Sequence, residues 1–240
     1  MGESISRDPT RTGSEAGGAV QDPTRGETGR ARSATDGQGE LGSERSPMRM
    51  LPVTADPGPL GLAAFAATTF MLSMFNAGLM GKSGEVVVLG MALAYGGFAQ
   101  LLAGMWEFRT GNTFGAVAFT SYGAFWLSFW AFNQFFADKI TDKATTMHAV
   151  GLYLITWGIF TAYMFVASLR VSVAVCVVFA LLAATFLVLG IGNAQESESI
   201  VKAGGYIGLA TAVAAWYASF AAVTNSTFGR SVLPVKELKR

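Results

Sequence analysis

Residues that could do chemistry are few in this sequence, and they do not come together at catalytic or metal-binding spacings. The chain holds one histidine, His148, and one cysteine, Cys176. Nucleophilic catalysis needs an activating base beside the nucleophile, and metal catalysis needs several ligands close together. Neither set can be picked out here. The sequence therefore predicts a protein that is not an enzyme, with no catalytic residues, no metal site and no cofactor.

The two isolated residues have simple interpretations. Cys176 lies in the apolar run Val-Ala-Val-Cys-Val-Val, where we expect a small packing residue rather than a reactive thiol. His148 could titrate near neutral pH and carry a proton. Its own apolar run contains no carboxylate that could be its partner, so we favour an interfacial position for it.

Neutral polar side chains suggest a different kind of chemistry, because many of them interrupt long apolar runs. Hydroxyl and amide groups cost free energy inside a membrane unless they meet a partner or a wet cavity. They can replace the hydration of a small solute or a carboxylate, or they can join one helix to another. No Asp, Glu, Lys or Arg stands in the middle of any of these runs. That pattern favours passive, channel-like conduction over a buried proton relay.

Six apolar runs must position these side chains. They cover residues 60–80, 86–106, 111–137, 144–169, 171–195 and 203–229, and each is as long as the roughly 20 residues that cross a bilayer as a helix. Lipid offers no hydrogen-bond partner to the backbone, so the runs must be helical. We predict an all-α integral membrane protein in which six transmembrane helices form a bundle around a pore. Glycine-rich helix faces allow close packing within one chain or between subunits.

The first 50 residues have a different composition. They are rich in Gly, Ser and Thr and carry seven Arg against eight acidic residues, a mixture that leaves little to build a core. We predict a disordered cytoplasmic tail at 1–54, a transport domain at 55–235 and a short basic tail at 236–240. Six spans put both termini on one side, and the basic C-terminal residues favour the cytoplasm. The net charge of +1, without a basic stripe, gives no sign of nucleic-acid binding.

Three motifs stand at the ends of these runs. The first is Asp-Pro-Gly-Pro-Leu-Gly-Leu at 56–62, and the second is Gly-Asn-Thr-Phe-Gly at 111–115, continuing to Trp126. The third joins Phe-Gly-Arg at 228–230 to Val-Leu-Pro at 232–234. Their order and spacing resemble the acetate uptake transporter family, the YaaH-type succinate-acetate permeases of bacteria and their fungal relatives. The family has Asn where Asp56 stands; both residues can cap a helix, but Asp adds a negative charge near the expected anion route.

The resemblance implies a plasma-membrane channel or permease for acetate and other short carboxylates such as succinate, assembled as a homo-hexamer with one pore per subunit. It also implies a pore constriction formed by Phe65, Tyr122 and Leu182. The position of Leu182 depends on counting back from Gly192, and Leu181 is adjacent. Further candidates for lining the substrate path are Asn76, Asn112, Thr113, Thr120 and Ser121.

Three alternative functions remain compatible with the sequence. One is a proton-coupled monocarboxylate symporter, and another is a pore for ammonia or a small neutral solute. The third is a membrane-bound sensor or scaffold whose N-terminal tail recruits partners.

Overall fold

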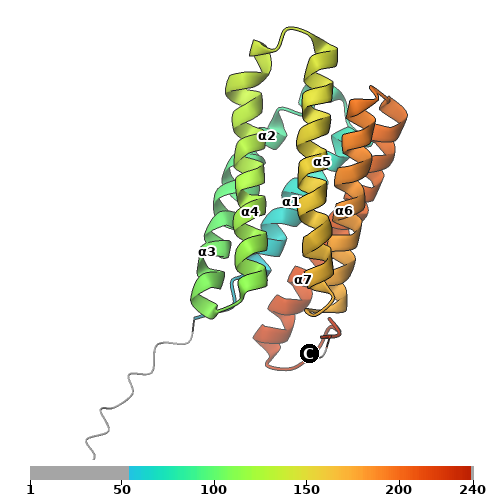
Figure 1. Ribbon diagram of the computed structural model, residues 1–240. Helices are drawn as coiled ribbons and strands as arrows, with labels where there is room; N and C mark the ends of the chain where they lie inside the picture. Colours follow the sequence, from blue (N-terminus) through green and yellow to red (C-terminus); the bar gives the residue numbers. More distant parts are fainter. Residues whose placement is uncertain (1–53, 239–240) are drawn as a thin grey trace, which may run out of the picture. The chain divides into compact units, whose positions relative to one another are not determined.

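The regular secondary structure of this protein is helical wherever the structure describes it. A computed structural model describes residues 54–238, so the last two residues and all but residue 54 of the predicted disordered tail at 1–54 lie outside the described part. The long helices run side by side in one bundle (Figure 1). They are α1 (Gly58–Asn76), α2 (Val87–Leu93), α3 (Gln100–Thr110), α4 (Thr113–Ala131), α5 (Lys143–Ser168), α6 (Val173–Ala194) and α7 (Glu198–Phe228). Short helical turns are η1 (Lys82–Gly84), η2 (Ala94–Ala99), η3 (Phe132–Phe136) and η4 (Ala137–Lys139).

Each of the six predicted spans corresponds to one long helical segment. In the second span, the π-helix η2 joins α2 and α3 into one continuous rod. Five segments are long and apolar enough to cross a membrane, namely α1, residues 82–110, α5, α6 and α7. Helix α4 has 19 residues and no charged side chain, but its Gly, Ser, Thr, Tyr and Trp residues lower its hydropathy. The all-helical membrane bundle predicted from the sequence is therefore confirmed.

Several span boundaries differ from the predicted ones. Helix α1 ends at Asn76 instead of Met80, because Gly78 adopts a φ of +74° and turns the chain away. Helix α3 continues beyond the predicted end at residue 106, so Glu107 is helical rather than part of a link. Helix α7 begins at Glu198, five residues early. Charged residues near helix ends therefore belong to the helices themselves.

Side chains accept hydrogen bonds from the first amides of α1 and α4. Asn112 is the N-cap of α4, and its side chain accepts a hydrogen bond of 3.1 Å from the Gly115 amide. Pro57 is the N-cap of α1, and the preceding Asp56 carboxylate accepts a bond of 2.8 Å from the Gly58 amide. Each bond satisfies a donor that has no partner inside its own helix.

Small residues allow neighbouring helices to approach closely. Helix α1 packs against α7, α7 against α6, α6 against α5, and α3 against α4. A Cβ atom added to Gly205 of α7 would collide with the backbone of Asn76 and Ala77, and one added to Gly104 of α3 would collide with Thr120 of α4. These glycines serve packing within one chain. Ser219 also donates a 2.7 Å hydrogen bond to the Pro59 carbonyl, which ties α7 to the start of α1.

The close approach of α3 and α4 can be tested with Gly104→Ala. The added methyl group must push Thr120 and its backbone aside, so we expect a loss of about 1–3 kcal/mol and a lower midpoint of thermal unfolding in detergent. Gly90→Ala is the matched control in the same span, because a Cβ atom there meets nothing within 4 Å. Equal midpoints for the two variants would contradict this packing.

Candidate functional site

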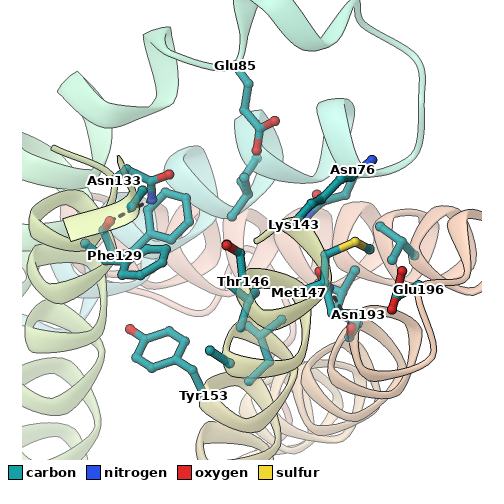
Figure 2. Close-up of a pocket in the computed structure, with 18 of the residues that line it drawn as sticks. Asn76, Glu85, Phe129, Asn133, Lys143, Thr146, Met147, Tyr153, Asn193 and Glu196 are labelled. Carbon is teal, nitrogen blue, oxygen red and sulfur yellow. Dashed lines mark hydrogen bonds between the residues drawn. The ribbon is translucent and has the colours of Figure 1, made fainter. Parts of the chain in front are cut away.

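A cavity of about 990 Å³ enters the bundle at the end where α4 is linked to α5. We call it the vestibule. Figure 2 shows Asn133, Lys143, Tyr153 and Asn193 around it. Its lining also includes Leu72, Asn76, Lys82, Glu85, Phe125, Phe129, Phe132, Thr146, Met147, Val150, Leu154, Leu189, Glu196, Glu198 and Val201. The vestibule thus collects side chains from α1 and from α4 to α7.

The vestibule is charged at its rim and neutral in its depth. Lys82 and Lys143 stand at the rim, where positive charge raises the local concentration of anions. Three acids lie among them: Glu198 is 2.8 Å from Lys202, Glu196 is 3.5 Å from the exposed His148, and Glu85 interacts electrostatically with Lys82. The carboxylate absent from the histidine's own run is therefore supplied by the α6–α7 link. The rim of the vestibule thus carries both lysines and glutamates.

The three predicted constriction residues meet in the middle of the bundle. Phe65 of α1, Tyr122 of α4 and Leu182 of α6 belong to one buried cluster, and their exposed fractions are 5%, 2% and 3%. The ring centroids of Phe65 and Tyr122 are 5.8 Å apart. Packing this tight leaves the centre of the bundle closed.

The predicted constriction residues lie one or two helical turns from Leu72, Phe125 and Leu189, the vestibule residues that we call its floor. On α1 and α6, the floor residues Leu72 and Leu189 are seven residues beyond the constriction residues of the same helices. Seven residues are about two helical turns, or roughly 10 Å. On α4 the floor residue Phe125 is one turn beyond Tyr122. The vestibule therefore ends close to the buried cluster that holds the three predicted constriction residues.

Tyr122 has neighbours that the sequence did not indicate. Its hydroxyl lies 2.9 Å from that of Thr161 on α5. Thr161 donates its own proton to the Trp157 carbonyl over 2.7 Å, so Tyr122 must be the donor of the bond between the hydroxyls. The Tyr122 ring also contacts Phe160, Phe179 and Phe186 at centroid distances of 5.4, 6.0 and 6.5 Å. No local pattern could have revealed these contacts, because they join α4 to α5 and α6.

The other path candidates are spread along the bundle. Asn76 lines the vestibule, whereas Asn112 and Thr113 are exposed at the opposite end of α4. Thr120 faces Gly104 of α3, and its hydroxyl has no partner among the described residues. Ser121 is half-buried beside Tyr122 in the sequence. The structure thus brings Asn76 to the vestibule and leaves a path role for the other four as a prediction.

The fold and the site define a class of protein and then a family. The class is an all-helical membrane bundle with a polar-lined vestibule above a closed apolar centre. The chain belongs to the GPR1/FUN34/yaaH family, whose model matches residues 38–239. The family resemblance inferred from the three sequence motifs is confirmed.

Relatives of known name agree with this assignment. The chain is 42% identical over 195 residues to acetate permease A of Emericella nidulans, covering 75% of this chain and 65% of that protein. It is 41% identical over 183 residues to the succinate-acetate/proton symporter SatP of Escherichia coli, covering 76% and 96%. The solved structure of the bacterial acetate channel SatP aligns with a TM-score of 0.71 at 40% identity, covering 76% of this chain and 99% of that one. The chain therefore spans about two-thirds of the fungal relative's length.

Thiol labelling can test the order of vestibule and constriction along α6. In a Cys176→Ala background, we expect Asn193→Cys to react with a polar maleimide at least about tenfold faster than Leu182→Cys, because access limits the reaction of a thiol. Asn193 lines the vestibule, whereas Leu182 is buried. The rates are measured on purified protein by mass shift. Similar rates at the two positions would mean that the route is not closed at Leu182.

Proposed function

We propose that this protein is a plasma-membrane channel or permease for acetate and other short carboxylates such as succinate. The observation that carries the proposal is a vestibule with lysines and glutamates at its rim and neutral side chains in its depth, which ends near the cluster of Phe65, Tyr122 and Leu182. The printed names of the relatives, an acetate permease, a succinate-acetate/proton symporter and an acetate channel, support the same substrates.

The residues suit a carboxylate in the order in which it would meet them. Lys82 and Lys143 attract the anion to the rim. Deeper in the vestibule, the amides of Asn76 and Asn193 can replace part of its water shell without holding it as a fixed cation would. At the constriction, Tyr122 supplies one neutral donor. That donor is already used by Thr161, so passage requires the hydroxyl to exchange Thr161 for the substrate.

The surroundings of the bundle belong to the same proposal. We place both termini in the cytoplasm, with residues 1–54 as an attached tail before the transport domain at 55–235. Large apolar side chains cover the outside of the bundle, including Phe98, Leu152, Ile159 and Phe220, and these are suited to contact lipid or a neighbouring subunit. A homo-hexamer with one pore per subunit is the assembly we propose, and native mass spectrometry from detergent measures it.

Transport is tested with purified protein in liposomes and labelled acetate under imposed pH and voltage gradients. We expect acetate uptake above that of empty vesicles. A passive channel retains uptake in the presence of a proton ionophore, whereas a proton-coupled symporter loses saturable uptake when the gradient collapses. Acetate flux equal to that of empty vesicles would contradict the proposal and favour a neutral-solute pore or a scaffold.

The aperture is tested with Leu182→Ala. Removing this side chain enlarges the narrowest part of the route, so we expect the ratio of lactate to acetate flux to rise up to about tenfold, the scale on which apolar contacts discriminate substrates. Leu181→Ala is the matched control, since Leu181 is only half-buried and lies outside the buried cluster. A rise for Leu181→Ala alone would assign the constriction to the other residue.

A further inference from the structure

A buried carboxyl group lies at the end of the bundle opposite the vestibule. Glu107 is in the last turn of α3, and only 2% of it is exposed. Acidic side chains are rarely buried to this extent without a cationic partner. The ion pairs within residues 54–238 join Lys202 to Glu198 and His148 to Glu196, and neither includes Glu107. The transport route described above does not use this group.

The carboxyl group is held between the first turns of α1 and α4. Thr110 donates a 3.1 Å hydrogen bond to Oε2 of Glu107. A Cβ atom at Gly115 would lie 2.7 Å from Oε1, and one at Gly58 would lie 3.3 Å from the same oxygen. The two glycines therefore make room for the carboxyl group beside two helix N-termini, where a negative charge is stabilised.

Other features of this corner favour the neutral, protonated form of Glu107. Asp56 also lies beside Gly58, with Oδ1 3.0 Å from the position of a Cβ atom there, so two carboxyl groups share this corner. Helices α1 and α4, which pack on α3, contain no Asp, Glu, Lys, Arg or His, and Arg109 on α3 itself is exposed. Burial and the neighbouring Asp56 favour the neutral acid, whereas Thr110 and the helix starts favour the carboxylate. A group under such opposed influences is suited to exchange a proton.

A line of unpartnered polar atoms begins on the same face of α3. Gln100 lies seven residues before Glu107, about two turns or roughly 10 Å along the helix, and is 1% exposed. Neither its amide nitrogen nor its amide oxygen has a hydrogen-bond partner among the described residues, and the same holds for the hydroxyls of Thr69 and Thr120 on the adjoining helices. Buried polar groups of this kind are normally satisfied by bound water. The interface of α1, α3 and α4 therefore holds four polar side-chain atoms that bound water can satisfy.

We propose that Glu107 is a proton-binding site that makes carboxylate transport depend on pH, separate from the constriction. This inference depends on the proposed transport function. A proton adds to the Glu107 carboxylate and leaves again to water, and no other bond changes. In its charged form, together with Asp56, the site repels an anion at the end of the bundle opposite the vestibule. The protonated form lacks that charge, so the carboxylate flux rises as the pH falls.

The test is tracer exchange of labelled acetate in liposomes at equal pH on both sides, between about pH 5 and pH 8, the range over which a perturbed carboxyl group titrates. We expect the wild-type flux to rise about tenfold as the pH falls and the Glu107→Gln flux to change less than about twofold, after subtraction of empty vesicles. The fraction of ionised acetate at each pH is the same for both proteins, so it cancels in the comparison. Parallel pH profiles would overturn the proposal, since a purely structural Glu107 is well replaced by Gln.

Two further variants sharpen the result. Asp138→Asn removes an exposed acid outside the vestibule, and we expect it to keep the wild-type profile. Asp56→Asn removes the charge that disfavours the Glu107 carboxylate, so the midpoint of the profile should move to lower pH. If Glu107→Gln fails to fold, an unchanged midpoint in Asp56→Asn overturns the proposal by itself. Absence of wild-type flux would instead refute the transport function.

Discussion

Hydrocarbon cannot form hydrogen bonds with a peptide group, and this constraint determines how the whole bundle is built. The backbone satisfies its hydrogen bonds by becoming helical, and polar side chains satisfy theirs by bonding to carbonyl groups of their own helix. Thr68, Thr185 and Thr211 each donate to the carbonyl four residues earlier, at 2.8–2.9 Å. Most hydroxyls inside the bundle are thus already occupied, and the few that are not mark the places where something else can bind.

The same constraint applies to the hydroxyl group of Tyr122. Its hydroxyl has a partner in the closed bundle, so closing the route leaves no donor unsatisfied. In the proposed route, a carboxylate would accept a charge-assisted hydrogen bond from Tyr122 in place of the neutral bond to Thr161. A charged donor at this position would hold the anion more strongly and slow its release. Aromatic rings surround the Tyr122 ring in the closed bundle.

The sequence was sufficient for those features that depend on one segment at a time. Long uncharged runs located six helices, and the motifs around Phe65 and Tyr122 identified two residues that meet in the core. It was insufficient where several helices converge. Glu107 resembled a solvent-facing link because it is followed by Arg109, and only the packing of α1 and α4 buries it. The hydrogen bond between Tyr122 and Thr161 could not be predicted from the sequence either, since 39 residues separate them.

The π-helical turn η2 has a geometric consequence for the second span. A π-turn holds one more residue than an α-turn, so everything after it is rotated by about 100° relative to an uninterrupted α-helix. This rotation determines which side of α3 faces the neighbouring helices. A straight α-helix of the same sequence would direct the Glu107 side chain about a quarter-turn away from the corner formed by Gly58 and Gly115. The local under-winding of these six residues thus sets the direction of the Glu107 side chain, two turns further along the second span.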